Sequence, residues 1–204
     1  GKQTTTAANI LQATITVTPS AGQNKTYNTT PVADPELTYT YTGAVNNETP
    51  AFTGALARSE GENAGGYVIN QGTLKLIDGA GFKASNYTLA FSGTEVKFTI
   101  NKADYGDKTA SGSAMYGHSG TVDLSGLVAE GGGLSINAQS TDSDKVLNGM
   151  TEIKNKVLSF GFVNDASKAG KTATVVISVR NATNYNDYTI TVTLTVENKL
   201  TPVL

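Results

Sequence analysis

The sequence predicts an all-β protein made of two consecutive small antiparallel β-sandwich modules of immunoglobulin-like (Ig-like) type. For the first module, a β-grasp-like unit is the alternative. Apolar and polar residues alternate with a period of two in several stretches, most clearly over 188–196, as they do in strands that bury one face. Clusters of Gly, Asn and Pro separate these stretches. The order Asn-Tyr, strand region, Asn-Lys occurs twice in the chain, once ending at residue 102 and once at residue 199. This repetition indicates two modules.

In the first module, Ile15 and Val17 alternate with threonines until Pro19 ends the strand. Residues 25–27 could form a short edge strand, and Asp34-Pro35 favours a turn because the residue before a proline avoids the helical region. Residues 52–57 could be a strand or one helical turn. The remaining expected strands lie at 37–42, 67–69, 74–76, 89–91 and 96–100, the last two as a strand pair joined by the Ser92-Gly93 turn.

In the second module, apolar residues at 122–128 precede three glycines at 131–133, which we interpret as a hairpin turn. Residues 146–157 carry apolar side chains at helical spacing, but Gly149 lies within them, so we favour strand-turn-strand over a helix. Residues 168–171 are expected to form a turn. The other expected strand positions are 134–136, 160–162, 173–179 and 188–196.

These patterns divide the chain into four parts. Residues 1–12 are a linker or a lead-in, 13–102 the first module, 103–200 the second, and 201–204 the start of a further segment. Because the chain begins with Gly1-Lys2 and no initiator methionine, we expect it to be a piece of a longer protein.

Composition excludes several classes of site and partner. The formal charge of −2 and the scattered lysines and arginines give no electrostatic basis for binding nucleic acid. The absence of cysteine removes disulfides, thiolate metal sites and cysteine nucleophiles. No apolar run approaches the roughly 18 residues that span a bilayer. We expect no cofactor and no membrane insertion in this segment, and we also expect it to be a monomer.

Residues 15–100 resemble the MBG-type repeat of large bacterial surface and adhesin-like proteins. The usual Tyr-Gly after the first strand is Tyr27-Asn28 here, and we expect a similar turn because Asn tolerates the left-handed conformation. Residues 103–200 resemble, less specifically, the Ig-like repeats that follow such modules. The motifs that carry the first resemblance are Ile15-Thr16-Val17, Pro35-Glu36-Leu37-Thr38-Tyr39, Gly54-Ala55-Leu56, Gly61-Glu62-Asn63, Gly66-Tyr67-Val68-Ile69, Gly72-Thr73-Leu74, Asn86-Tyr87 and Phe98-Thr99-Ile100.

Few side chains are candidates for a chemical site. His118 is the only histidine, and no nucleophile elbow accompanies it, so we interpret it as an exposed loop residue. Asp142 and Asp144 are the best candidates for a Ca²⁺ site, because Ca²⁺ prefers several oxygen ligands from one loop. Asp104 and Asp107 are a weaker version of the same pattern. We expect no catalytic residue, no cofactor-binding residue and, beyond these candidates, no metal ligand.

Tyr39 and Tyr41 lie on one face of an expected strand, and could be an exposed pair for sugar stacking. Packing in the core is the favoured alternative. Specificity for a ligand would otherwise lie in loops 43–51 or 129–145. A Lys-Asn isopeptide bond is possible in principle, but no buried triplet is evident in the sequence.

The resemblance implies an exported, multi-repeat parent protein displayed on the bacterial cell surface, associated with the cell wall, or secreted. We expect this segment to be a non-catalytic structural spacer. A module that binds host glycans or surface proteins, and an accessory module of a secreted enzyme, are the alternatives.

Overall fold

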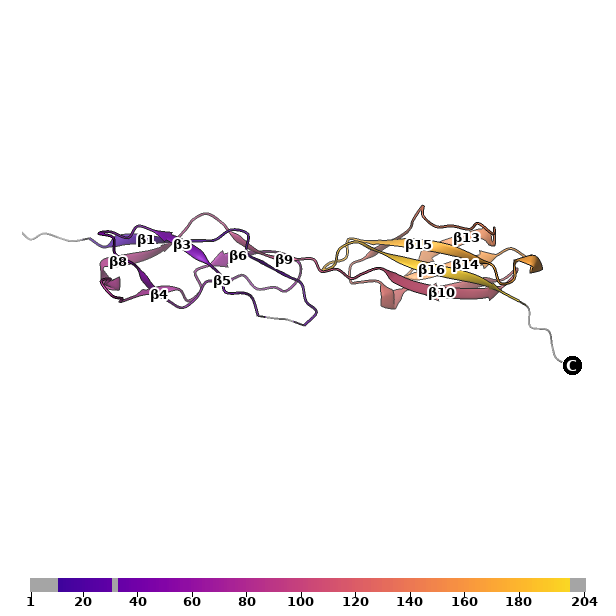
Figure 1. The fold of residues 1–204 in the computed structure, drawn as a ribbon, viewed down its shortest axis with the longest axis horizontal. Helices are drawn as coiled ribbons and strands as arrows, with labels where there is room; N and C mark the ends of the chain where they lie inside the picture. The colour runs from indigo at the N-terminus through magenta and orange to yellow at the C-terminus, as the bar shows by residue number, and fades with distance from the viewer. Residues whose placement is uncertain (1–10, 31–32, 199–204) are drawn as a thin grey trace, which may run out of the picture. The chain divides into compact units, whose positions relative to one another are not determined.

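The computed structural model describes residues 11–30 and 33–198, and the chain divides into two compact units between Asn101 and Lys102 (Figure 1). The predictions for residues 1–10 and 201–204 lie outside the described residues. Both units are built of strands, and the described helical segments are three short 3₁₀ turns, η1 (Ala84–Asn86), η2 (Ser125–Leu127) and η3 (Ala166–Lys168). The all-β class is therefore confirmed.

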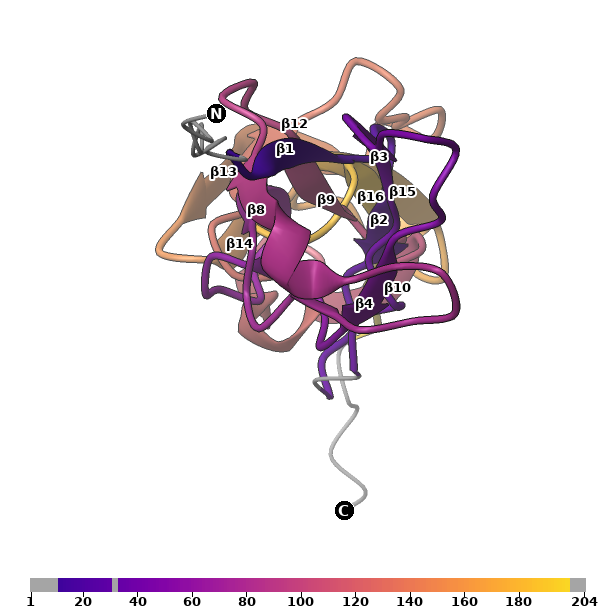
Figure 2. The same ribbon diagram turned by 90° about the vertical axis from the view of Figure 1, so that its left-hand side faces the viewer.

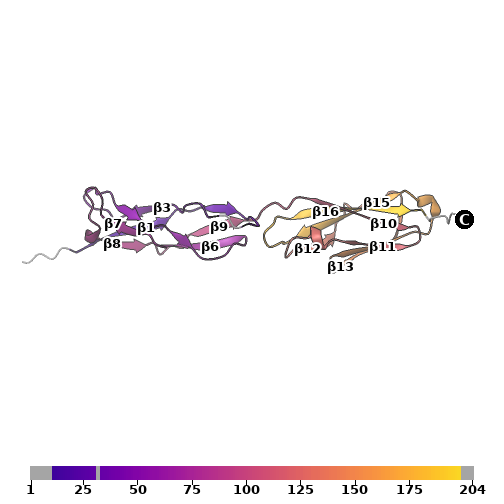
Figure 3. The same cartoon turned by 90° about the horizontal axis from the view of Figure 1, so that it is seen from below.

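Unit 1 contains three small sheets. The first has the order β3-β1-β8, the second β2-β9-β6-β5, and the third pairs β4 with β7. Figure 3 shows β6 beside β9, with which it pairs in antiparallel fashion. The strands are β1 (Ala13–Pro19), β2 (Asn24–Thr26), β3 (Tyr39–Thr42), β4 (Ala51–Thr53), β5 (Ala57–Arg58), β6 (Gly65–Asn70), β7 (Lys75–Ile77), β8 (Tyr87–Phe91) and β9 (Lys97–Asn101).

The N-terminal and C-terminal segments of unit 1 run parallel to each other. β1 pairs with β8 over five residue pairs, and β2 pairs with β9 over three. Figure 2 shows β1 between β3 and β8. β8 and β9 therefore follow each other in one direction in two different sheets. The prediction that 89–91 and 96–100 form a strand pair is wrong, because each segment finds its partner near the N-terminus instead.

Two hydrophobic clusters fill unit 1. The larger contains Val17, Leu37, Leu56, Ile69, Leu74, Phe98 and Ile100. The smaller contains Ile15, Phe82 and Tyr87, with the Phe82 and Tyr87 rings stacked at 4.9 Å between centroids. Within the described part of this unit the one helical segment, η1, has no buried residue. It cannot serve as the helix that packs on a β-grasp sheet, so the structure does not support that alternative.

Gly43, which follows β3, is expected to tolerate no side chain. Its φ is +97°, and a Cβ there would lie 2.0 Å from the carbonyl oxygen of Thr14. Gly22 has a φ of +78° with open space around it, so a side chain there meets only the backbone penalty. We expect Gly22→Ala to cost about 1 kcal/mol and Gly43→Ala about 3 kcal/mol of unfolding free energy. Thermal unfolding of the two variants tests this, and equal losses would contradict the steric explanation.

Unit 2 is a sandwich of a four-stranded and a three-stranded sheet. The strand orders are β10-β16-β15-β12 and β11-β14-β13. This is the Ig-like arrangement with the first strand placed beside the last, which confirms the Ig-like prediction for this unit. The strands are β10 (Lys108–Met115), β11 (Ser119–Asp123), β12 (Gly133–Ile136), β13 (Leu147–Lys154), β14 (Val157–Phe162), β15 (Thr172–Arg180) and β16 (Tyr188–Glu197).

Two local predictions for unit 2 have different outcomes. Residues 147–154 form a strand, as favoured, and the left-handed residues Asn155 and Lys156 turn the chain into β14. The helix alternative is therefore wrong. The glycines at 131–133 do not form a hairpin turn, because β12 pairs with β15 and not with β11. They lead the chain from one sheet of the sandwich to the other.

The core of unit 2 lies between its two sheets. Inward residues of β15 and β16 are almost fully buried, and those of β16 alternate with threonines. Tyr188 is buried as well, and its hydroxyl donates to the carbonyl of Leu127 at 2.8 Å and accepts from the amide of Ala129 at 2.8 Å. None of the helical segments in residues 11–30 and 33–198 has the length and hydrophobicity needed to cross a bilayer.

Candidate functional site

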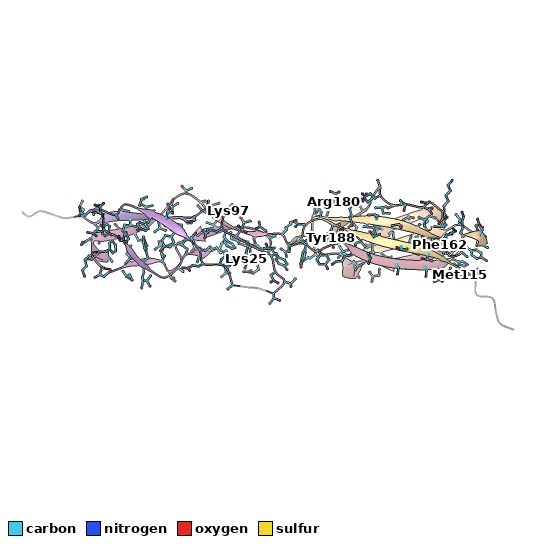
Figure 4. The ribbon with its side chains drawn as sticks, in the orientation of Figure 1. Lys25, Lys97, Met115, Phe162, Arg180 and Tyr188 are labelled. Atoms are coloured by element: carbon cyan, nitrogen blue, oxygen red, sulfur yellow. The ribbon has the colours of Figure 1, made fainter. Side chains whose placement is uncertain are left out.

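A cluster of four charged side chains in unit 1 centres on Arg58. Its Nε and Nη2 donate to the two carboxylate oxygens of Asp34, at 2.6 and 3.2 Å. Nη2 also donates to Glu62 Oε1 at 2.8 Å. Lys25 Nζ lies 2.7 Å from Asp34 Oδ1 and 2.8 Å from Glu62 Oε2, so two cations and two anions alternate (Lys25 is labelled in Figure 4). We call Lys25, Asp34, Arg58 and Glu62 the arginine cluster.

The two cations of the arginine cluster are shielded from solvent, whereas Glu62 is exposed. The Arg58 side chain is only 7% exposed, and its guanidinium carbon lies 4.7 Å from the centroid of the Tyr67 ring and 5.5 Å from that of Phe98. Its Nη1 donates to the carbonyls of Ser59 and Gly61, at 3.0 and 2.6 Å. The guanidinium therefore has polar partners around its edge and aromatic rings beside its face, an environment that suits arginine far better than lysine.

This geometry explains the Gly61-Glu62-Asn63 motif. A Cβ on Gly61 would lie 2.2 Å from Cε1 of Tyr67, so glycine leaves room for the ring that stacks on Arg58. The hydroxyl of Tyr67 donates to the carbonyl of Asn63 at 2.6 Å and holds that ring in place. Each residue of the motif thus supports the arginine cluster. Gly61 does so by lacking a side chain, Glu62 through its carboxylate and Asn63 through its carbonyl oxygen.

A cleft of about 530 Å³ lies beside the arginine cluster, between residues 34–37 and 55–62. Leu37 and Leu56 contribute apolar surface, and Glu36 and Glu60 are exposed at this cleft. The donors of Arg58 are already bonded, so the guanidinium offers the cleft no free hydrogen bond. The arrangement ties the loop at Asp34 to β5. It presents no activated nucleophile.

The arginine cluster makes stability depend on pH. Hydrogen bonds from Arg58 and then from Lys25 lower the pKa of Asp34 from its ordinary 3.8, although burial opposes them. The stabilisation is complete above pH 3.8 and is lost as the pH falls through the lower folded pKa. The carboxylates raise the pKa of Lys25 above 10.5, so its contribution is present below pH 10.5 and is lost above it.

We therefore expect unit 1 to lose stability in acid below about pH 4. Hydrogen exchange of unit 1 peptides, measured from pH 6 to pH 2.5 and corrected for the intrinsic exchange rate, tests this. Asp34→Asn should destabilise unit 1 at neutral pH and flatten this part of the acid dependence. An unchanged acid profile in Asp34→Asn would contradict the assignment to this carboxylate.

The Lys25 amine also bears on the isopeptide hypothesis. The amine pairs with the carboxylates of Asp34 and Glu62, which favour its charged form. Forming an amide needs a neutral amine, so this geometry favours an ion pair over a cross-link.

The structure separates the two candidate Ca²⁺ ligands. Both oxygens of Asp142 accept backbone hydrogen bonds, from Val146 at 2.7 Å and Leu147 at 2.9 Å. Asp144 lies 3.8 Å from the amine of Lys171, and its carbonyl accepts from Lys168. Among the described residues no three acidic or histidine side chains gather as a metal site requires. Asp142 thus shapes the loop that leads into β13.

The other candidate side chains also lie apart. His118 is exposed in the turn between β10 and β11. Asp104 accepts from the amide of Gly106 at 3.2 Å, and Asp107 from the amide of Thr189 at 2.7 Å. The bond from Thr189 lowers the pKa of Asp107. Asp104 thus stabilises a local turn, and Asp107 ties the segment before β10 to the start of β16.

Tyr39 and Tyr41 share one face of β3, as predicted. Each ring centroid lies 5.4 Å from that of Phe52, but the two tyrosines are buried to different extents. Tyr39 packs against the larger core of unit 1, and burial raises its pKa, whereas Tyr41 is 40% exposed. Of the pair, Tyr41 alone presents substantial ring surface to solvent.

Sequence reasoning did not find the arginine cluster as a unit. In the sequence, Asp34 and Glu62 were noted only within motifs, and Lys25 only within a short expected strand. Arg58 was not noted. A signal was present, because Arg58 is one of two arginines in a chain with 16% charged residues and directly follows the apolar Leu56-Ala57. A charge in such a position is rarely buried without a partner.

Comparison with protein families adds an identification for unit 1. Residues 15–99 match the MBG domain (YGX type). The match covers most of unit 1 and less than half of the chain, and confirms the resemblance drawn from the motifs. In this MBG unit Asn28 does not have a positive φ, so the expected left-handed turn is wrong there. Its side chain instead accepts from the amide of Thr30 at 3.1 Å.

An MBG domain suggests a repeat module of a surface protein. No curated protein matches the sequence. Solved structures with detectable similarity include two endo-fucoidan hydrolases of glycoside hydrolase family 107. MfFcnA4 is 12% identical, with a TM-score of 0.29 over 90% of this chain and 29% of the hydrolase. MfFcnA9 is 10% identical, with a TM-score of 0.28 over 76% of this chain and 28% of the hydrolase. At these scores the likeness carries no argument about function.

Proposed function

We propose that this chain is a non-catalytic spacer segment of a multi-repeat bacterial surface protein of the adhesin-like type. The observation that carries the proposal is the MBG match over residues 15–99, followed in the same chain by a second β unit with its own core. The segment would lie outside the cell, associated with the cell wall or secreted. It would act as a monomer without a cofactor and hold a terminal binding domain away from the surface.

The chemistry of the side chains is consistent with this role. The acidic residues of the arginine cluster neutralise neighbouring cations, and Asp107 and Asp142 accept hydrogen bonds from backbone amides. Polar groups used in this way stabilise a fold. They are not free for general acid or base chemistry.

The test is a replacement in the full-length parent protein. Residues 13–198 are exchanged for two unrelated β modules of similar length, and surface display and adhesion are measured on intact cells. A spacer predicts that both persist, while deletion of the segment reduces adhesion. Loss of adhesion with normal display after the exchange would overturn the proposal and favour a binding module. Extracellular protease treatment of intact cells tests the proposed location.

A second candidate is a module that binds host glycans or proteins, and the exposed ring of Tyr41 beside Phe52 favours it. Removing Tyr39 would disturb the core, so Tyr41→Ala is the informative variant, with Ile77→Ala as a control of similar exposure. A glycan-array signal from the wild-type segment that Tyr41→Ala abolishes and Ile77→Ala retains would support binding. Absence of any signal would leave the spacer proposal in place.

A further inference from the structure

The first and last strands of unit 2 form a parallel pair, and this geometry decides how the unit responds to tension. β10 and β16 pair over eight residue pairs, from Lys108↔Ile190 to Met115↔Glu197. The chain therefore enters unit 2 at one end of this ladder and leaves at the other. In Figure 4, Tyr188 at the start of β16 and Met115 at the end of β10 mark these opposite ends.

A pull on the two ends of the chain would draw β10 and β16 in opposite directions along their common axis. The hydrogen bonds of a β ladder run across the strands, so all of them are loaded together in this shear geometry. A pull on two strands at the same end of a ladder would instead break one pair after another. A pull on the chain ends therefore loads unit 2 in shear, which is the stronger of the two loading geometries.

In unit 1, too, a pull on the chain ends loads parallel ladders in shear, and here there are two such ladders. Its first segment pairs in parallel with its last segment through β1 and β8, and again through β2 and β9. Three backbone hydrogen bonds flank these ladders, from Ser92 to Val17, from Thr99 to Gln23 and from Tyr27 to Asn101, at 2.8 to 3.0 Å. Chain ends that leave unit 1 are therefore also joined by ladders loaded in shear.

β10 packs closely on the core of unit 2. A Cβ on Gly112 would lie 2.5 Å from Val122 and 3.1 Å from the ring of Phe160, so glycine lets the strand lie close to the core. Val192 and Leu194 of β16, which pair with Ala110 and Gly112, are fully buried. Water therefore cannot readily replace the hydrogen bonds on the buried side of the ladder.

We propose that both units are tension-bearing modules, in which the parallel pairing of the N-terminal and C-terminal segments acts as a shear clamp between the chain ends. Its biological meaning rests on the proposed function, because a spacer between a cell and its target is loaded through its two ends. The mechanical property itself belongs to the isolated segment and can be measured without the parent protein.

The test is single-molecule force spectroscopy of the whole 204-residue chain with paired cysteines as attachment points. The sequence contains no cysteine, so two introduced cysteines define the pulling direction without ambiguity. Asp104→Cys with Asn198→Cys loads β10 and β16 in shear. His118→Cys with Asn198→Cys pulls both strands from the end at Met115, and Asp104→Cys with Asn186→Cys pulls both from the opposite end. All four positions are exposed.

We expect the unfolding force in shear to exceed both peeling forces by at least about twofold, because eight pairs share the load instead of breaking in turn. Unfolding of the shear pair should extend the chain by up to about 300 Å, since roughly 90 residues lengthen by 3.3–3.6 Å each. Equal forces in the three geometries, or a lower force in shear, would overturn the proposal. Denaturant unfolding of each variant without force confirms that the cysteines leave the fold intact.

The two proposals fail independently. A high shear force combined with loss of adhesion in the replacement experiment would keep the clamp and overturn the spacer. Retained adhesion combined with a low shear force would keep the spacer and overturn the clamp.

Discussion

Replacing Arg58 with alanine should destabilise unit 1 by about 3 kcal/mol. The substitution leaves Asp34 and Glu62 with one cation where they had two. It also removes a side chain that is only 7% exposed and whose guanidinium lies near two aromatic rings. Loss of one partner from a fully buried ion pair costs about 3–5 kcal/mol. Asp34 and Glu62 keep 27% and 49% of their side-chain surface in water, which places the loss at the lower end.

Hydrogen exchange measured by mass spectrometry resolves this effect by unit. Peptides from unit 1 should lose protection in Arg58→Ala, while the slowest peptides of unit 2 keep it because that unit has a separate core. Arg58→Lys is the matched control, since it keeps the charge and loses the forked hydrogen bonds, and it should cost about half as much. Full stability of Arg58→Ala would show that the arginine cluster is not a structural tie.

Replacing Phe160 with alanine should destabilise unit 2 by about 4 kcal/mol. Phe160 is fully buried, and its ring fills the space left by Gly112 and Gly120, where a Cβ would approach the ring to 3.1 and 2.5 Å. It also packs edge-on against Phe162, with 5.2 Å between centroids. Neighbours that are glycines have no side chains to move into the cavity, so little of the loss can be recovered.

Phe160→Leu is the control, because it keeps most of the volume and should cost about 1.5 kcal/mol or less. Thermal unfolding together with hydrogen exchange of β10, β11 and β14 measures both variants. If alanine and leucine cost the same, the ring would not be filling a defined space, and the packing of β10 on the core would need another explanation.

Many strands could be predicted from the sequence because alternation depends only on which face of a strand is buried. Residues 13–19 and 188–196 show this directly, since their threonines and aliphatic residues separate by a period of two. Partners could not be predicted in the same way. Residues 89–91 and 96–100 look like a hairpin, yet β8 and β9 pair with β1 and β2, about 75 residues away along the chain.

The candidate sites show the same division. Asp142 has the residue type of a Ca²⁺ ligand, but its two oxygens accept from the amides of Val146 and Leu147, which no local pattern reveals. Tyr39 and Tyr41 were correctly placed on one face, and only packing against Phe52 and the core distinguishes their burial. The identity of a side chain limits its chemistry. Its neighbours decide which part of that chemistry is used.

The sequence by itself determined the all-β class, the division into two modules and the MBG-type identity of residues 15–99, since these depend on local alternation and on motifs in a fixed order. Tertiary structure alone decided that Lys25, Asp34, Arg58 and Glu62 meet, and that the first and last segments of each unit run parallel. Both outcomes depend on contacts between residues far apart in the chain. Such contacts form because the folded core compensates for the entropy of closing long loops, and a local pattern does not record that balance.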